Sequence, residues 1–276
     1  MKKKCTYLLF IPCIVLILYF MITPLIGTIF PTFKENDGFA LKLYMNFFKD
    51  DYMIAVFYRT LKISLVASII CMIIGVPVSY YISRTSQKVR GLFIALTIFP
   101  ILTNSVVRSF AWMSILGKNG VINTLLLKLN VIEEPVSLLY TEGAIITGTV
   151  YIFLPLMVIS LVGVMENIES DLLEAAESLG ANRVKAFFKI IFPLSLPGLI
   201  VGTVLVFTGS LTAYTTPQLL GGNKNTVLAT LIYQKTMSLG DWQGASVVAT
   251  IMIITTLIVI KSINYLASRM DKRGVS

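Results

Sequence analysis

Long apolar runs alternate with short polar segments along this chain, and six of the runs are long enough to cross a lipid bilayer. An apolar helix needs about 20 residues to cross about 30 Å of hydrocarbon. The pattern therefore predicts an all-α membrane protein with six transmembrane helices. The predicted spans cover residues 7–30, 63–82, 92–116, 144–165, 198–220 and 245–266.

Two of these runs are interrupted, and the first resembles part of a signal peptide. Pro100 and Arg108 interrupt the third run, and Gly209 and Pro217 interrupt the fifth. The first run follows three lysines, as the apolar region of a signal peptide would. It is too long for that role, because such a region has about 7–15 residues. We therefore predict that the first run is a retained transmembrane helix.

The composition agrees with a membrane protein. Of the 276 residues, 56% are hydrophobic and 13% are charged, and the mean hydropathy is +0.82. Soluble domains carry about 25% charged residues. The net charge of +9 would suit a nucleic-acid-binding protein, but the basic residues lie between the apolar runs and form no continuous basic face. We therefore expect no nucleic-acid partner.

The distribution of lysine and arginine predicts the orientation, because these residues accumulate in cytoplasmic loops. With the N-terminus inside, thirteen of the 23 basic residues fall in cytoplasmic segments and nine in the three external segments, which are together longer. The short segment 84–90 alone holds Arg84, Lys88 and Arg90. Both termini are therefore predicted to be cytoplasmic.

Few side chains are available for metal binding or catalysis. The chain has no histidine, and its three cysteines, Cys5, Cys13 and Cys71, lack CxxC spacing. The predicted spans hold no paired carboxylates. We therefore expect no metal site, no disulfide framework and no cofactor in this chain. A membrane enzyme would need a cluster of polar catalytic residues, which the pattern does not offer.

The external connections contain short amphipathic patterns. The segments 31–60 and 117–142 include such patterns, for example at residues 121–127, and these could lie along the membrane interface. The acidic pairs Asp50–Asp51 and Glu133–Glu134 are interpreted as solvated turns rather than binding sites.

The connection between the fourth and fifth spans, residues 166–197, is unusually long and has a helical pattern of its own. Ser170 is a candidate N-cap, with Asp171 in the first turn. Gly180 stands where a left-handed residue would end the helix. At helical spacing, one apolar stripe comprises Leu172, Ala176 and Leu179, and a different, acidic face comprises Asp171, Glu174 and Glu177.

A second short helix is predicted after Gly180. Asn182 is its candidate cap, and Pro193 is expected to stop it. Two helices joined at a glycine would form a protruding elbow, and the small side chains of Ala175 and Ala176 would let a partner approach closely. The periodicity leaves two interpretations open: docking into a partner protein, or lying on lipid headgroups. The apolar positions of the second helix are Val184, Phe187, Phe188 and Ile191.

The same loop resembles the EAA loop of binding-protein-dependent ABC importer permeases. That signature reads E-A-A, three residues, G, nine residues and I-x-L-P; this chain has E-A-A-E-S-L-G at 174–180 and I-I-F-P at 190–193. It departs from the signature at Phe192, where leucine is usual, and the replacement is also apolar. The resemblance implies that the loop receives the motor subunits. The residues it assigns to coupling are Glu174, Ala175, Ala176, Gly180, Ile190 and Pro193.

Further segments are similar to spermidine/putrescine permease subunits, namely 99–108, 111–112, 116–123, 221–225 and 241–242. The likeness covers most of residues 60–270. It implies a type I ABC importer permease fold in a bacterial cell membrane and polyamine import by alternating access. It also implies the partners: two ATP-binding-cassette ATPase subunits, a second homologous permease and an extracytoplasmic substrate-binding protein.

The chain carries no ATP site of its own. A P-loop needs G-x-x-x-x-G-K-[ST], and the nearest fragment, at 117–119, lacks the leading glycine and the Ser/Thr. ATP and magnesium are therefore expected on the partner ATPase subunits. We divide the chain into residues 1–60, with the first helix and an external segment, and residues 61–276, a five-helix permease core with the loop 166–197.

Candidate residues for the substrate path are mostly aromatic or polar, because no Asp or Glu lies at mid-depth in the predicted spans. Aromatic faces can hold ammonium groups, but aromatic residues at span ends are also common interface anchors. Arg108 is either a gate or clamp beside the path, or an interface residue at an early end of the third span. The candidates are Arg108, Trp112, Tyr151, Phe153, Tyr214 and Thr215.

Other functions remain as alternatives. Permeases for opines, ferric ion, phosphonates or thiamine share the EAA loop, so the cargo is open. A secondary transporter or channel would need ionisable residues at mid-membrane, and only Arg108 offers one.

Overall fold

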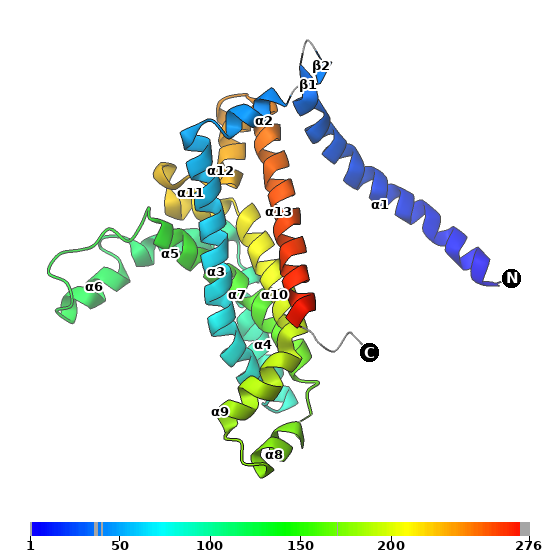
Figure 1. Ribbon diagram of the computed structural model, residues 1–276. Helices are drawn as coiled ribbons and strands as arrows, with labels where there is room; N and C mark the ends of the chain where they lie inside the picture. The colour runs from blue at the N-terminus through cyan, green and yellow to red at the C-terminus, as the bar shows by residue number, and fades with distance from the viewer. Residues whose placement is uncertain (1, 36–37, 40, 170, 271–276) are drawn as a thin grey trace. The chain divides into compact units, whose positions relative to one another are not determined.

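The computed structural model describes residues 2–35, 38–39, 41–169 and 171–270, and these residues are almost entirely helical (Figure 1). The strands among them are β1, Lys34–Glu35, and β2, Gly38–Phe39, which pair antiparallel. The chain separates into two compact units. The first comprises Met1–Ala55 with Leu231–Ile254, and the second comprises Val56–Thr230 with Thr255–Ser276.

The first unit contains the N-terminal helix α1, Lys2–Phe33, whose apolar window has no residue buried within the chain. Such a surface suits lipid, which is as apolar as the side chains that it meets. The unit also holds α2, Lys42–Phe47, and the π-helix η3, Gln234–Ser238. Two long helices run between the units: α3, Asp51–Ser83, and α13, Trp242–Met270.

The second unit is built on the packing of three long helices. These are α3, α7 (Glu142–Met165) and α10 (Phe192–Thr212). The shorter elements around them are α4 (Gln87–Leu102), α5 (Ser105–Leu116), α6 (Val121–Lys128), α8 (Asp171–Ser178), α9 (Arg183–Ala186), the π-helix η1 (Phe187–Ile191), α11 (Thr215–Gly221) and the 3-10 helix η2 (Asn223–Asn225). The helix α12, Leu228–Tyr233, begins in this unit and ends in the first.

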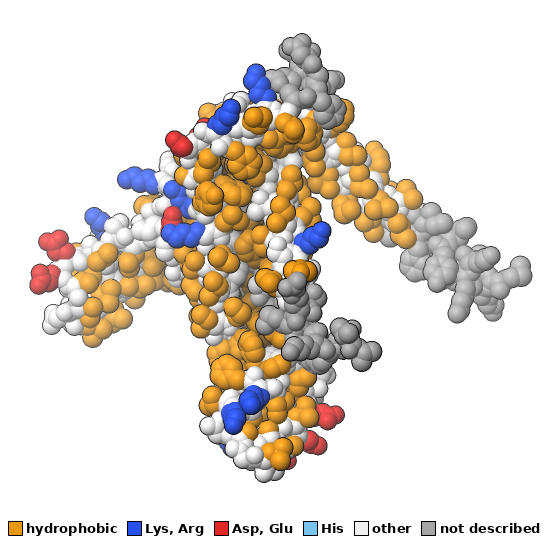
Figure 2. Space-filling model, viewed as in Figure 1, with side chains coloured by type: hydrophobic (Ala, Val, Ile, Leu, Met, Phe, Trp, Pro, Cys, Tyr) orange, Lys and Arg blue, Asp and Glu red, His pale blue; other side chains and the backbone are white. Residues whose placement is uncertain are grey.

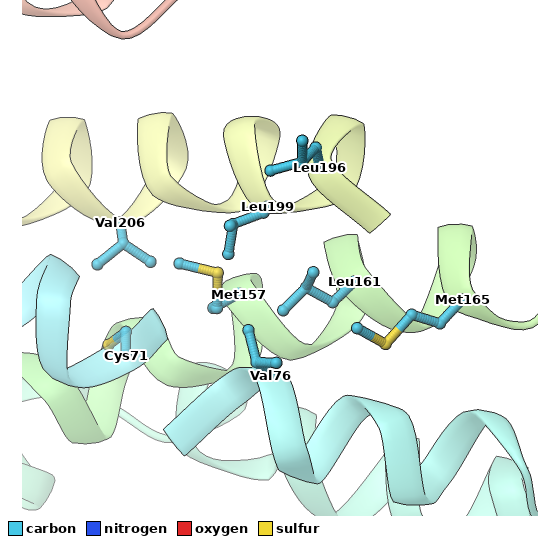
Figure 3. Packing of buried hydrophobic residues seen from close by; sticks show 8 residues of the cluster. All are labelled: Cys71, Val76, Met157, Leu161, Met165, Leu196, Leu199 and Val206. Carbon is cyan, nitrogen blue, oxygen red and sulfur yellow. The ribbon is translucent and has the colours of Figure 1, made fainter. Parts of the chain in front are cut away.

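Met157 of α7 lies at the centre of this core (Figure 3). A Cβ atom added at Gly75 of α3 would lie 2.6 Å from Met157 Cγ, and one added at Gly202 of α10 would lie 2.7 Å from Met157 Sδ. Small residues let transmembrane helices approach closely. The two glycines therefore let α3 and α10 close around one methionine.

The number of predicted spans agrees with the structure. Among the described residues, five helices are long and apolar enough to cross a membrane, and a sixth span is counted if α4 and the segment Ser105–Lys128, which holds α5 and α6, are taken as one bent span. The bend between the two is 94°, at the interruption expected around Pro100 and Arg108. In the view of Figure 2, hydrophobic side chains cover the length of α3, and charged side chains gather mainly near helix ends.

The predicted boundaries of the fifth span are wrong. The expected helix covers 198–220, but the continuous helix runs over Arg183–Thr212, and Ala213 is extended. Pro193 does not stop the short helix. It stands in the first turn of α10, directly after the π-helical turn η1, where the backbone N–H of Phe192 donates to Phe187 O. This wider turn and the first-turn position accommodate a residue that has no backbone N–H to donate.

Candidate functional site

The loop between α7 and α10 has the predicted hinge at Gly180. Gly180 has a φ of +84°, and its N–H donates to Glu177 O, while the N–H of Ala181 donates to Ala176 O. This pair of bonds is the Schellman motif, which ends a helix with a left-handed residue. The predicted glycine cap of α8 is therefore confirmed. The proposed N-cap, Ser170, lies outside the described residues.

The second half of the loop begins at the predicted cap. The Oδ1 atom of Asn182 accepts a hydrogen bond from the backbone N–H of Lys185 at 2.8 Å, so Asn182 is the N-cap of α9. The chain then passes through α9 and η1 into α10 without a break. The part of the loop after Gly180 therefore continues as helix into the transmembrane helix α10.

The loop exposes three apolar side chains over most of their surface. Leu179 is 89% exposed, Val184 66% and Phe188 61%. Exposed apolar patches on a polar segment mark interaction sites. Of the residues assigned to coupling, Glu174, Ala175 and Gly180 are exposed, whereas Ala176, Ile190 and Pro193 are partly buried.

Two arginines that the sequence reasoning did not single out hold the start of the loop. Arg90 Nη1 donates to Glu166 Oε2 at 2.8 Å, and Arg84 Nη1 donates to Ile168 O at 3.0 Å. Arg90 also donates through Nη2 to the backbone oxygens of Ser83 and Thr85. The basic segment 84–90, which joins α3 to α4, therefore anchors the start of the loop to this connection. The paired residues are 76 and 84 positions apart, so no local pattern could reveal them.

Three of the six path candidates line one cavity in the second unit. Arg108, Trp112 and Tyr151 surround about 260 Å³ of space together with Thr103, Val107, Ala111 and Ile115. The rings of Trp112 and Tyr151 meet edge to face, with their centroids 5.6 Å apart. The cavity wall is mainly apolar and aromatic, with one positive charge.

Arg108 is largely buried and bonded to the end of α4. Its Nη1 donates to the backbone oxygens of Pro100 and Thr103. These carbonyls belong to the last turn and the C-cap of α4, where a helix carries a partial negative charge. Arg108 therefore caps the break in the third span. This geometry leaves the guanidinium at the edge of the cavity, and the role of Arg108 as a gate or clamp stays a prediction.

The other three path candidates lie elsewhere. Phe153 packs against the core cluster of α3, α7 and α10, and a Cβ atom added at Gly209 would lie 2.3 Å from its Cε1 atom. Tyr214 and Thr215, both partly buried, stand at the start of α11, where the chain turns after α10. The structure does not bring them to the cavity around Trp112. Their role in transport stays a prediction.

At the opposite ends of α3 and α7 from the loop, a charged cluster joins three segments. Arg59 Nε and Lys62 Nζ of α3 lie 3.3 and 2.8 Å from the two carboxylate oxygens of Glu142, the first residue of α7. Arg59 also donates to Thr226 O at 3.1 Å. Sequence reasoning missed this cluster, because the residues that bond to each other in it are 80 or more positions apart.

The sequence matches a family model over residues 6–272, described as "Binding-protein-dependent transport system inner membrane component". The chain belongs to this family. Its relatives include the spermidine/putrescine transport system permease protein PotB of Escherichia coli strain K12. This chain is 33% identical to that protein over 91% of its own length and 92% of the relative's. The corresponding Haemophilus influenzae protein is 32% identical, over 94% and 92%.

Other relatives and solved structures agree with this assignment. A putative ferric transport system permease protein, FbpB 1 of Haemophilus influenzae, is 26% identical, and 39% of its length is covered. A bacterial ABC transporter involved in alginate import has a TM-score of 0.82 at 18% identity, over 98% of this chain and 97% of that one. The MetNI methionine ABC transporter has a TM-score of 0.54 at 18% identity, over 82% and 99%.

These matches confirm the resemblance that the loop indicates. The chain has the fold of ABC importer permeases and is a permease subunit of such an importer. The family members are membrane-embedded transport subunits, and their solved neighbours include a complex with a periplasmic protein and a transporter named MetNI.

Proposed function

We propose that this permease moves polyamines, spermidine or putrescine, into the cytoplasm by alternating access driven by separate ATPase subunits. The observation that carries the cargo is the identity of 33% to PotB across more than nine-tenths of both chains. The ferric permease relative reaches 26% and is matched over less than half of its length. Permeases for opines, phosphonates, thiamine or ferric ion are the rival cargo classes.

The loop 166–197 couples the permease to its motor. ATP binding closes the two ATPase subunits, and the loop passes that movement into the membrane helices. The exposed Leu179, Val184 and Phe188 support this role, since apolar side chains at a polar loop need a protein cover. The coupling residues are Glu174, Ala175, Ala176, Gly180, Ile190 and Pro193, with the turn at Gly180 fixing the angle between the two arms.

The complex contains this permease, a second homologous permease, two ATP-binding-cassette ATPase subunits and an extracytoplasmic substrate-binding protein. ATP and magnesium bind to the ATPase subunits, and this chain is a transport subunit without an ATP site of its own. The complex lies in the bacterial cell membrane. Most cargo selectivity belongs to the binding protein, which agrees with a permease cavity that holds few polar groups.

Both termini lie in the cytoplasm in this proposal. Its support is the position of the basic segment 84–90 beside the loop, because Arg84 and Arg90 bond to residues at the start of that loop. Short loops rich in Lys and Arg favour the cytoplasmic side. The cluster of Arg59, Lys62 and Glu142 at the other ends of α3 and α7 then faces outward.

The cavity between α5 and α7 is the proposed part of the path in this chain. Trp112 and Tyr151 offer aromatic faces to an alkyl ammonium group, an attraction worth about 0.5–2 kcal/mol per favourable pair. Arg108 is not a cargo ligand, because its positive charge would repel a polyamine. Its bonds to the α4 carbonyls hold the wall in place instead. Phe153, Tyr214 and Thr215 are further path candidates outside this cavity.

Two experiments test the cargo. The first is thermal-shift screening of the binding protein encoded nearby against spermidine, putrescine, ferric ion, thiamine, an opine and a phosphonate. The second is uptake of labelled spermidine and putrescine by cells that carry or lack this chain. Stabilisation by a polyamine and chain-dependent uptake are expected. Stabilisation by a rival cargo alone, with no polyamine uptake, would overturn the cargo assignment and leave the permease assignment intact.

A further inference from the structure

The cytoplasmic end of α3 touches both stems of the loop. The first stem, residues 166–169, follows α7, and the second stem is α9 with η1, residues 183–191. Tyr80 of α3 reaches the second stem: its ring lies edge to face with that of Phe187, with the centroids 4.9 Å apart. Arg84, the residue directly after the end of α3 at Ser83, reaches the first stem through its bond to Ile168 O.

Tyr80 and Arg84 are also in contact with each other. The guanidinium carbon of Arg84 lies 5.7 Å from the centroid of the Tyr80 ring, over its face. A guanidinium over an aromatic face is attracted by the ring's electrons. The contacts therefore form one continuous path from Ile168 through Arg84 and Tyr80 to Phe187. We refer to Tyr80 and Arg84 as the stem clasp.

Phe187 is the point at which the second stem meets the core. It is partly buried and packs against the core cluster, whereas its neighbour Phe188 is 61% exposed. Phe187 is also the first residue of the π-helical turn η1, and its carbonyl accepts the i to i−5 bond from Phe192. Such wide turns often mark functional sites in helices. The stem clasp thus contacts the loop at η1, the turn that joins α9 to α10.

The bonds of Arg84 also leave room for rearrangement. Its Nε and Nη2 atoms are buried within the described chain and have no hydrogen-bond partner there. Buried donors without acceptors are unfavourable, so a guanidinium in this state is held less firmly than a fully paired one. Arg90 has more bonds than Arg84, to Glu166 and to two backbone oxygens near the end of α3, and only its Nε is buried without a partner among the described residues.

We infer that Tyr80 and Arg84 are positioning residues for energy coupling, which join both stems of the loop to α3 so that movement of the loop moves this helix. The inference rests on the proposed coupling role of the loop. The loop needs such a link because α8 has no residue buried against the rest of the chain. Movement can pass through the second stem into α10 directly, but α3 receives it through side chains alone.

The test uses the complete importer in proteoliposomes and measures ATP hydrolysis with and without the binding protein, purified together with the cargo it carries. We expect Tyr80→Leu and Arg84→Gln to lower the stimulation of hydrolysis by at least about fivefold, the smaller end of typical coupling between sites. The unstimulated rate and the assembly of the complex should be unchanged. Tyr80→Phe should keep normal stimulation, because the contacts with Phe187 and Arg84 are made by the ring and not by the hydroxyl.

The matched control is Tyr81→Leu. Tyr81 is the next residue of α3 but is 65% exposed, and its ring meets Phe93 of α4 at 6.1 Å rather than the loop. Stimulation should be normal in this variant. The double variant Tyr80→Leu with Arg84→Gln should lose no more than either single variant, because contacting residues that act together are not additive.

Normal stimulation in Tyr80→Leu would overturn the inference, as would an equal loss in Tyr81→Leu. If Tyr80→Leu does not assemble, Arg84→Gln decides, and normal stimulation in that variant has the same meaning. Gly180→Val separates this result from the proposed function. Normal stimulation in Gly180→Val contradicts the coupling role of the loop itself, whereas a loss there with normal Tyr80→Leu contradicts only the stem clasp.

Discussion

The backbone of Gly198 in α10 lies directly against that of Ser160 in α7: a Cβ atom added at Gly198 would be 2.6 Å from the carbonyl oxygen of Ser160. A backbone atom cannot swing away as the end of a flexible side chain can. The contact lies toward the ends of α7 and α10 that carry the loop, so it sets how closely the two helices pack there.

Gly198→Ala should therefore separate α7 and α10 and destabilise the complex by about 1–3 kcal/mol, the usual cost of overpacking. The measurement is the thermal unfolding midpoint of the detergent-purified importer. Gly163→Ala is the control, because Gly163 lies in α7, the other helix of this pair, and has open space around its Cβ position. An unchanged midpoint in Gly198→Ala would contradict the close approach.

Gly180→Val should leave the chain in the membrane but lower cargo uptake by at least about fivefold, in line with ordinary coupling energies. The φ of +84° at Gly180 is costly for a β-branched residue, so the angle between α8 and α9 should change. Uptake in cells measures this effect. Gly91→Val in α4, where the space is open, provides the control. Normal uptake by the Gly180 variant would refute the coupling assignment.

Arg108→Gln should destabilise the connection between α4 and α5. It removes a charged donor from the carbonyls of Pro100 and Thr103, and hydrogen bonds to charged groups contribute about 1.5–3 kcal/mol each. The expected result is a lower unfolding midpoint of the purified complex, with part of the loss recovered in Arg108→Lys. A midpoint equal to that of the unchanged protein would show that the bonds of Arg108 to Pro100 and Thr103 do not stabilise the complex.

The stability of the turn before α13 should depend on pH. Lys235 lies 2.8 Å from Asp241 Oδ2, and the N–H of Gly244 donates to Oδ1; these bonds lower the pKa of Asp241 below its ordinary value of 3.8. Because the folded pKa is depressed, the stabilisation is present above about pH 4 and is lost as the pH falls below this value.

Hydrogen exchange of residues 239–248 measures this effect. Asp241→Asn should speed exchange at pH 7, because the amide keeps neither the charge nor both acceptors. The difference between the variant and the unchanged chain should shrink toward pH 3. A difference that is constant across this range would exclude Asp241 as its source.

Local patterns were sufficient for much of the loop. The left-handed Gly180 and the Asn182 cap follow from residues within one helical turn, because capping involves backbone groups only a few positions away. The same reasoning failed at Pro193. A proline usually stops a helix, but a preceding π-helical turn and a first-turn position remove the conflict, and neither is visible in the pattern of apolar positions.

By itself, the sequence determined that this is a helical membrane protein and where its EAA-like loop lies. Both depend on hydropathy and on short-range signals. Only the tertiary structure decided that Tyr80 meets Phe187, that Arg90 pairs with Glu166, and that Arg108 caps α4. The physical reason is distance along the chain. Contacts between helices depend on how the helices pack and rotate, and one apolar helix face looks much like another in sequence.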